Sequence, residues 1–144
     1  MIAIGCDHGG YELKEKVVAH LKEKGYEVKD FGCNSTASVD YPEFGHKVGK
    51  AVASRECEKG IVICTTGIGI SISANKIKGV RCALCSDTLS AKMTRLHNDA
   101  NVLAFGAGIV GQNLAFDLVD TFLETEFSGE ERHQRRIDLI EKDI

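Results

Sequence analysis

Five short apolar runs alternate with longer stretches of helical spacing, and this alternation constrains the fold more than any other feature of the sequence. No two apolar runs are joined by the short glycine-containing turn that is typical of a β-hairpin. Regular alternation of strand and helix predicts a parallel sheet covered by helices on both faces. The length of 144 residues suits one domain. We therefore predict an α/β fold, a single-domain Rossmann-like three-layer sandwich with a five-stranded parallel sheet over residues 1–144.

The apolar runs and the helical spacing also give approximate bounds for each element. The expected strands cover residues 1–5, 26–31, 61–63, 80–85 and 101–105, and the expected helices cover 11–24, 43–55, 70–76, 87–96 and 109–127. A charged C-terminal tail at about 130–144 also has helical spacing. Residues 26–31 alternate apolar and charged side chains, which indicates an edge strand. Residues 97–99 are expected to form a polar turn after the fourth helix.

Composition and charge exclude several classes of protein. The net charge is −3, so there is no basic field to attract nucleic acid. The apolar runs are too short for a membrane span, and no secretory signal is found, so we expect a cytoplasmic protein. Six cysteines without such a signal are expected to be free thiols. Cys82 and Cys85 form a C-x-x-C pair without a second ligand pair, so no metal and no cofactor are expected.

The central stretch, residues 60–73, reads GIVICTTGIGISIS and combines a thiol with a glycine-rich turn. A buried strand ends at Cys64 and passes through glycines into a helix, which leaves backbone N–H groups free to hold an anion. A thiolate is favoured beside such groups. A tight turn around a structural cysteine would give the same pattern. Gly67 and Gly69 are not followed by the third glycine of a dinucleotide fingerprint, and the lysine of a P-loop is missing.

Three polar turns should meet at the carboxyl ends of the strands, where ligands bind in parallel sheets. They are Asp7-His8, Cys64–Gly69 and Gly106–Gly108. His97 and Asn98 end a helix and are therefore expected at the opposite edge of the sheet. They can join Cys64 only from a second subunit, which predicts a dimer with shared sites.

Each of these polar residues also has a structural explanation. Asp7 can cap the first helix, His8 can lie in a surface turn, and His97 can simply be solvated. A structural role is expected for His20, His46 and His133. Arg132, Arg135 and Arg136 form either a solvated helix face or an anion clamp.

Several motifs together resemble one family. They are IAIGCDHGGYELK at residues 2–14, DYP at 40–42, ICTTGIGISISANK at 63–76, GVR at 79–81, HNDANVLAFG at 97–106 and RHQRR at 132–136. On these motifs the chain resembles the ribose-5-phosphate isomerase B family, which also includes galactose-6-phosphate and allose-6-phosphate isomerases. The resemblance spans nearly the whole chain as one sugar-phosphate isomerase domain.

The resemblance implies a metal-independent aldose–ketose isomerisation of ribose 5-phosphate, a reaction of the pentose phosphate pathway. It implies that Cys64 is the base, that His97 opens the sugar ring, and that Thr66 assists at the reacting oxygens. It also implies a phosphorylated sugar as ligand and a homodimer or tetramer, with no nucleic acid and no membrane. The implied substrate-binding residues are Asp7, His8, Tyr41, Thr65, Gly67, Ile68, Gly69, Asn98, Arg132 and Arg136.

Two positions depart from the family pattern. The family usually has glycine where Thr65 stands, and often a phosphate-binding arginine where Gly108 stands. These departures leave the preferred sugar open, so a hexose 6-phosphate isomerase is an alternative. A non-catalytic phosphosugar-binding module and a nucleotide-binding domain are further alternatives.

Overall fold

The computed structural model describes residues 1–142. Its centre is a five-stranded sheet in which every neighbouring pair is parallel, with the order β2-β1-β3-β5-β4. The strands are β1 (Ile2–Cys6), β2 (Val28–Asp30), β3 (Lys59–Cys64), β4 (Cys82–Leu84) and β5 (Val102–Gly106). β1, β3 and β5 are almost wholly buried, as expected for apolar strands covered on both faces, whereas β2 and β4 are short edge strands.

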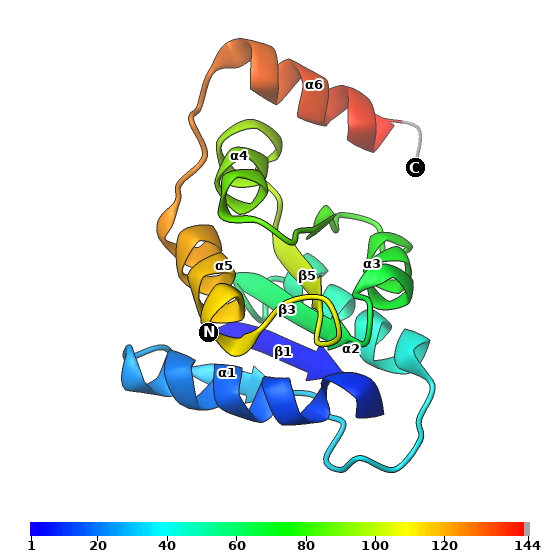
Figure 1. Ribbon diagram of the computed structural model, residues 1–144. Helices are drawn as coiled ribbons and strands as arrows, with labels where there is room; N and C mark the ends of the chain where they lie inside the picture. Colours follow the sequence, from blue (N-terminus) through cyan, green and yellow to red (C-terminus); the bar gives the residue numbers. More distant parts are fainter. Residues whose placement is uncertain (143–144) are drawn as a thin grey trace.

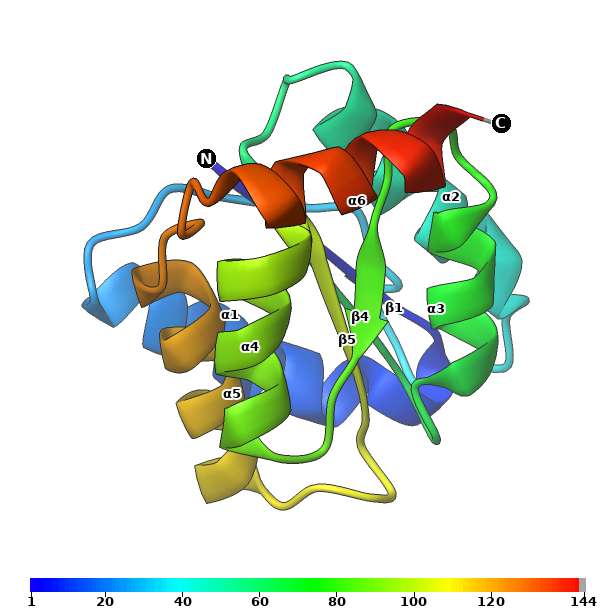
Figure 2. The same cartoon turned by 90° about the horizontal axis from the view of Figure 1, so that it is seen from above.

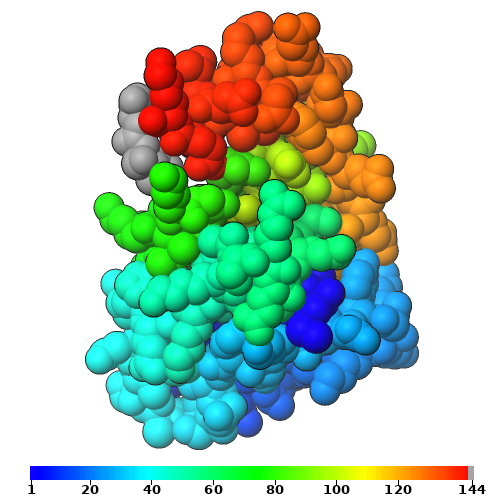
Figure 3. All heavy atoms as spheres, turned by 180° about the vertical axis from the view of Figure 1, so that it is seen from behind, coloured from blue at the N-terminus to red at the C-terminus, as the bar shows by residue number. Residues whose placement is uncertain are grey.

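Helices cover both faces of this sheet (Figure 1). They are α1 (Tyr11–Glu23), α2 (Tyr41–Ala53), α3 (Ile68–Asn75), α4 (Thr88–Asn98), α5 (Gln112–Glu124) and α6 (Glu131–Lys142), with a short 3-10 turn η1 (His8–Gly10). α2 and α3 pack together on one face, α1, α4 and α5 lie on the other, and α6 packs against α4. In the view from behind, α6 forms one end of the molecule (Figure 3). The predicted three-layer α/β fold is confirmed.

Some predicted bounds are wrong for identifiable reasons. The helix expected at 109–127 begins only at Gln112, because the amides of Ile109 and Val110 both bond the carbonyl of Gly106 in a turn. The edge strands are shorter than predicted. His97 and Asn98 do not form a turn but the last residues of α4, which Asp99 ends in a left-handed conformation with φ of 44°.

Lys14 is a charged residue whose side chain is completely buried. Its Nζ donates to both carboxylate oxygens of Asp30, at 3.0 and 2.8 Å, and to the carbonyl of Cys33 at 2.7 Å. Burial alone lowers the pKa of Lys14, but the hydrogen bond and charge of Asp30 outweigh it, so the pKa is raised. The ion pair fastens α1 to β2 and to the chain that follows it.

The strand order creates a crevice at the carboxyl ends of β1 and β3. β1 leads to α1 on one face of the sheet, and its neighbour β3 leads to α3 on the other face. The two connections therefore separate, and ligands of open α/β sheets bind at such a point. The residues after β1 and β3 thus flank the most favourable place for a site.

Candidate active site

An open pocket of about 480 Å³ occupies this crevice. The residues lining it come from the loops after β1 and β3 and from the starts of α2 and α3: Asp7, Tyr41, Cys64, Thr65, Thr66, Ile68, Gly69 and Ile72. The structure therefore brings together most of the residues that the sequence predicted around Cys64. Ile72 is an addition that was not predicted.

Cys64 lies at the floor of the pocket, where β3 ends. The residue is only 5% exposed, yet it lines the cavity. The backbone N–H of Gly67 donates to its Sγ at 3.1 Å. Gly67 has a φ of +78°, and a Cβ there would lie 2.6 Å from the carbonyl carbon of Phe105, so only glycine fits this turn. The turn thus aims a backbone N–H at the sulfur.

The remaining amides of the turn are divided between internal and open positions. The N–H of Ile68 donates to Oγ1 of Thr66 at 3.2 Å. Within residues 1–142, the N–H groups of Thr65 and Thr66 donate no hydrogen bond. Two backbone donors therefore stay available beside the thiol.

The turn after β1 supplies Asp7 and His8. Oδ1 of Asp7 accepts from the amides of Gly9 and Gly10, at 2.9 and 3.2 Å, so this residue caps η1 as well as lining the pocket. Nδ1 of His8 accepts from the amide of Val39 at 3.2 Å, which places the proton of the neutral ring on Nε2.

Tyr41 and Thr65 shape the walls of the pocket. The ring of Tyr41 covers Gly69, where a Cβ would lie 2.6 Å from the ring carbons. Thr65 packs between two glycines: a Cβ on Gly9 would overlap its hydroxyl, and a Cβ on Gly108 would lie 3.2 Å from its methyl group. Thr65 also lines a second hollow of about 370 Å³ together with Gly9 and Gly108. Its side chain separates the two hollows.

A second polar cluster lies at the other edge of the sheet. The ring of His97, in the last turn of α4, stacks on that of His133 in α6, with centroids 4.1 Å apart and planes 16° apart. α6 also carries Arg132 and Arg136. Figure 2 shows α6 near the start of β4, whereas the loops after β3 and β5 lie at the far end. Within one chain, Cys64 thus lies apart from His97, Asn98, Arg132 and Arg136.

His133 is a residue that the sequence interpretation assigned a structural role only. It is buried, and burial, the neighbouring ring of His97 and the charges of Arg132 and Arg136 lower its pKa, although Glu130 opposes this. Its stacking on His97 depends on the packing of α4 against α6 and could not be read from spacing. In the sequence, only the neighbouring arginines of the RHQRR motif indicated that His133 lies in a polar cluster.

Cys82 and Cys85, the C-x-x-C pair, do not offer a second reactive thiolate. Burial raises the pKa of Cys85 to about 11, and Cys82 is raised further, so both are thiols near neutral pH. Within the described chain, no three His, Cys, Asp or Glu side chains are grouped as metal ligands. None of the helices described is both long and apolar enough to cross a membrane.

Known proteins resemble this chain along nearly its whole length. A family model described as Ribose/Galactose Isomerase matches residues 2–140. Ribose-5-phosphate isomerase B of Escherichia coli is 50% identical over 139 residues, which cover 96% of this chain and 93% of that protein. Galactose-6-phosphate isomerase subunit LacB of Clostridium acetobutylicum is 40% identical, over 99% of this chain and 85% of that protein.

Solved structures show the same fold. Ribose-5-phosphate isomerase B of Clostridium thermocellum superposes with a TM-score of 0.96 at 55% identity, over 98% of this chain and 95% of that chain. The Mycoplasma genitalium structure with bound ribulose-5-phosphate gives a TM-score of 0.93 at 41% identity, over 98% and 93% of the two chains.

Proposed function

Because the chain belongs to the Ribose/Galactose Isomerase family, we propose that it interconverts ribose 5-phosphate and ribulose 5-phosphate, with Cys64 as the base. The observation that carries this proposal is the amide of Gly67 directed at the Cys64 sulfur at 3.1 Å, in a pocket that also holds Asp7 and Thr66. The relatives named ribose-5-phosphate isomerase B support the choice of sugar. The reaction would be a cytoplasmic step of pentose phosphate metabolism.

The proposed reaction begins with opening of the furanose ring. A neutral imidazole of His97 takes the proton of the anomeric hydroxyl and returns a proton to the ring oxygen, because both of its nitrogens can exchange protons. This leaves the open-chain aldehyde that the next step requires.

Cys64 then moves a proton between two carbons. Its thiolate removes the proton from C2, the electron pair forms a C1–C2 double bond, and O1 takes the negative charge of an enediolate. The thiol returns that proton to C1, while the proton of O2 passes to O1 and leaves a ketone at C2. Atoms and charge balance without a metal or an external reductant.

Backbone donors around the thiol favour the enediolate. The open amides of Thr65 and Thr66 would bind the developing oxyanion, and such fixed donors often contribute the largest part of the lowering of the barrier. The hydroxyl of Thr66 and the amide side chain of Asn98 would contact the reacting oxygens. Gly67, Ile68 and Gly69 would shape this part of the site.

Side chains around the pocket would hold the rest of the substrate. Asp7 and Tyr41 line the pocket and would bind sugar hydroxyls. Nε2 of His8 is free to donate to a phosphate oxygen. Arg132 and Arg136 would complete the phosphate site, because guanidinium groups bind phosphate with paired hydrogen bonds.

We propose that these residues meet in a homodimer with shared sites. α6 and the last turn of α4, which carry His97, Asn98, Arg132 and Arg136, lie toward the start of β4, whereas Cys64 ends β3 at the opposite end of the strands. Ile68 and Ile72 line the pocket on one face of α3 and remain 52% and 56% exposed in the single chain. A second copy placed over them would bury this apolar surface and bring its His97 toward Cys64.

A hexose 6-phosphate isomerase is the second candidate. The galactose-6-phosphate isomerase relative favours this candidate. The hollow beside Gly108 also favours it, because Gly108 has no side chain that would fill the space. The values of kcat/KM for ribose 5-phosphate, allose 6-phosphate and galactose 6-phosphate distinguish the two candidates. A clear preference for a hexose phosphate would replace the pentose in the proposal.

Replacing the base tests the proposed reaction directly. Cys64→Ala should lower kcat for ribose 5-phosphate at least about a hundredfold, the usual contribution of a positioned proton-transfer group. Cys57→Ala, which removes a buried thiol outside the pocket, is the matched control and should retain activity. EDTA should not change the rate. A Cys64→Ala protein that keeps most of its activity would exclude this residue as the base.

A further inference from the structure

The guanidinium of Arg81 donates hydrogen bonds to two carbonyls at the end of α4 and to a carboxylate of α6. Its Nε donates to the carbonyl of Asn98 at 2.9 Å and its Nη2 to the carbonyl of Asp99 at 2.9 Å. Its Nη1 donates to Glu141 of α6 at 2.6 Å. The carbonyls at a helix C-terminus lack partners within the helix, and a cation there is favoured by the helix dipole.

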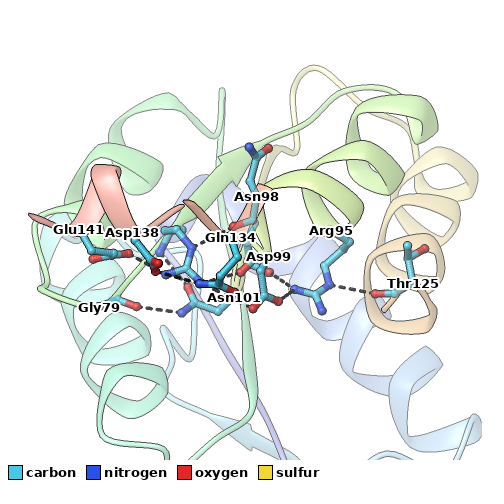
Figure 4. Close-up of polar contacts among 11 residues, drawn as sticks. Gly79, Arg95, Asn98, Asp99, Asn101, Thr125, Gln134, Asp138 and Glu141 are labelled. Atoms are coloured by element: carbon cyan, nitrogen blue, oxygen red, sulfur yellow. Dashed lines mark hydrogen bonds and ion pairs between the residues drawn. The ribbon is translucent and has the colours of Figure 1, made fainter. Parts of the chain in front are cut away.

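The contacts of Arg81 join two separate elements. Asn98 follows His97 in α4, whereas Glu141 belongs to the helix that carries Arg132 and Arg136. Figure 4 shows Asn98, Asp99 and Glu141 gathered around this contact. Because the guanidinium is flat and rigid, these contacts fix the two helices relative to one another.

A second arginine holds the same helix end to the body of the molecule. Arg95 donates to the side chain of Asp99 at 2.8 Å, to the carbonyl of Ala100 at 2.7 Å and to that of Thr125 at 3.0 Å. Figure 4 shows Arg95 between Asp99 and Thr125. None of these hydrogen bonds of Arg95 reaches α6. The polar link between the end of α4 and α6 is therefore the one that Arg81 makes through Glu141.

We propose that Arg81 is a positioning residue that holds the His97–Asn98 end of α4 and the arginine-bearing helix α6 as one unit. This inference rests on the proposed function, in which one subunit presents that unit to the partner's active-site thiol. Without the bridge, the stacking of His97 on His133 and the packing of α6 on α4 remain, but the position of the phosphate-binding arginines relative to His97 is held less firmly. Displacement by about 1 Å can cost a hundredfold in rate.

Kinetics of single variants give the first test. Arg81→Met should lower kcat for ribose 5-phosphate about tenfold to a hundredfold. Arg81→Lys should have a kcat between those of the wild type and Arg81→Met, because one ammonium group cannot make all the hydrogen bonds of the guanidinium. Glu141→Gln keeps the shape of the bridge and should show a smaller fall in kcat in a protein of normal stability. Arg55→Met removes an exposed arginine that lines a hollow of about 460 Å³ together with Arg81 and Arg95, and it should leave kinetics unchanged. Wild-type kcat in Arg81→Met would overturn the proposal.

Mixed dimers locate the defect within the site. Arg81→Met subunits co-expressed with Cys64→Ala subunits should recover about a quarter of the wild-type rate, because half of random dimers are mixed and each holds one intact site. The same subunits paired with His97→Ala subunits should recover nothing, because both lesions lie in the same half. Recovery with His97→Ala instead would place Arg81 in the Cys64 half and overturn the proposal.

A reference mixture keeps this test separate from the proposed function. Cys64→Ala and His97→Ala subunits should recover activity if sites are shared. If they recover no activity, the proposed shared site is wrong. The single variants then decide the role of Arg81: an Arg81→Met protein with unchanged kcat and unchanged contacts between α4 and α6 would reject the positioning role.

Discussion

The side chain of Thr65 fits between Gly9 and Gly108, because neither glycine has a side chain that would collide with it. Its hydroxyl occupies the space where a Cβ on Gly9 would lie, and its methyl group lies close to Gly108. Among residues 1–142, positive φ values outside glycine occur only at Arg55 and Asp99, so Thr65 adopts an ordinary backbone conformation. The departures at Thr65 and Gly108 are therefore spatially linked, since each lies beside the other.

Adding a methyl group at Gly9 tests this packing. Gly9→Ala should lower the free energy of unfolding by about 1–3 kcal/mol, because overpacking forces the Thr65 side chain to move. Thr65→Ala in the same chain should restore most of that loss, so the two changes are not additive. Urea unfolding measures both. Gly111→Ala, which adds a methyl group in open space, is the control, and equal losses with and without Thr65→Ala would contradict the explanation.

The sequence predicted Asp7, Cys64 and Thr66 at one site because they follow strands of a parallel sheet, whereas Tyr41 was implied only by the family resemblance. The sequence could not predict that the amide of Gly67 points at Sγ, because that direction depends on the left-handed conformation of Gly67. Polar spacing shows which residues are near one another; the orientation of a backbone amide depends on the folded turn.

At the scale of elements, α6 packs against α4 around the stacked rings of His97 and His133. His133 is buried, and its pKa is lowered by burial and by the cationic groups around it. Its pKa in the unfolded chain is about 6.5, so the unfolded chain binds more protons below that pH. The stability of the folded protein therefore rises with pH through this range.

Acidification should accordingly weaken the folded state through His133. The free energy of unfolding should fall as the pH is lowered from about 8 through 6.5 toward the lowered pKa of His133. His133→Phe keeps a flat ring against His97 and cannot take up a proton, so its profile should be flatter. Urea unfolding at a series of pH values measures both proteins, and parallel profiles would show that His133 is not responsible.

The elements themselves were predictable, but several of their ends and contacts were not. Apolar spacing continues through Ile109 and Val110, although both lie in a turn set by Gly106, so the start of α5 was misplaced. His97 and His133 lie on different helices, and no local pattern pairs them. Lys14 was not expected in the core because its partner Asp30 lies on a separate strand.

At the scale of the whole molecule, the direction of α4, which runs back along the sheet, separates the two halves of the proposed site. The loops after β1 and β3 carry Asp7 and Cys64, whereas α4 runs back and delivers His97 to the other edge. In the proposed function, one chain thus supplies two different half-sites. A dimer with a two-fold axis would combine them into two complete sites.

Mixing two inactive variants tests this arrangement. Cys64→Ala and His97→Ala should each be nearly inactive alone. Co-expressed subunits should recover about a quarter of the wild-type rate, since half of the random dimers are mixed and each contains one complete site. Isomerisation of ribose 5-phosphate by the purified mixture provides the measurement. Activity no higher than that of the separate variants would argue for sites within one chain.

Under the proposed shared site, the separation of Cys64 and His97 also makes turnover depend on the association of two subunits. A lone chain would carry both groups and still be unable to use them together. Activity per milligram should then decline on dilution once the concentration falls below that at which the subunits dissociate, and saturating sugar that bridges the two halves should hold the pair together.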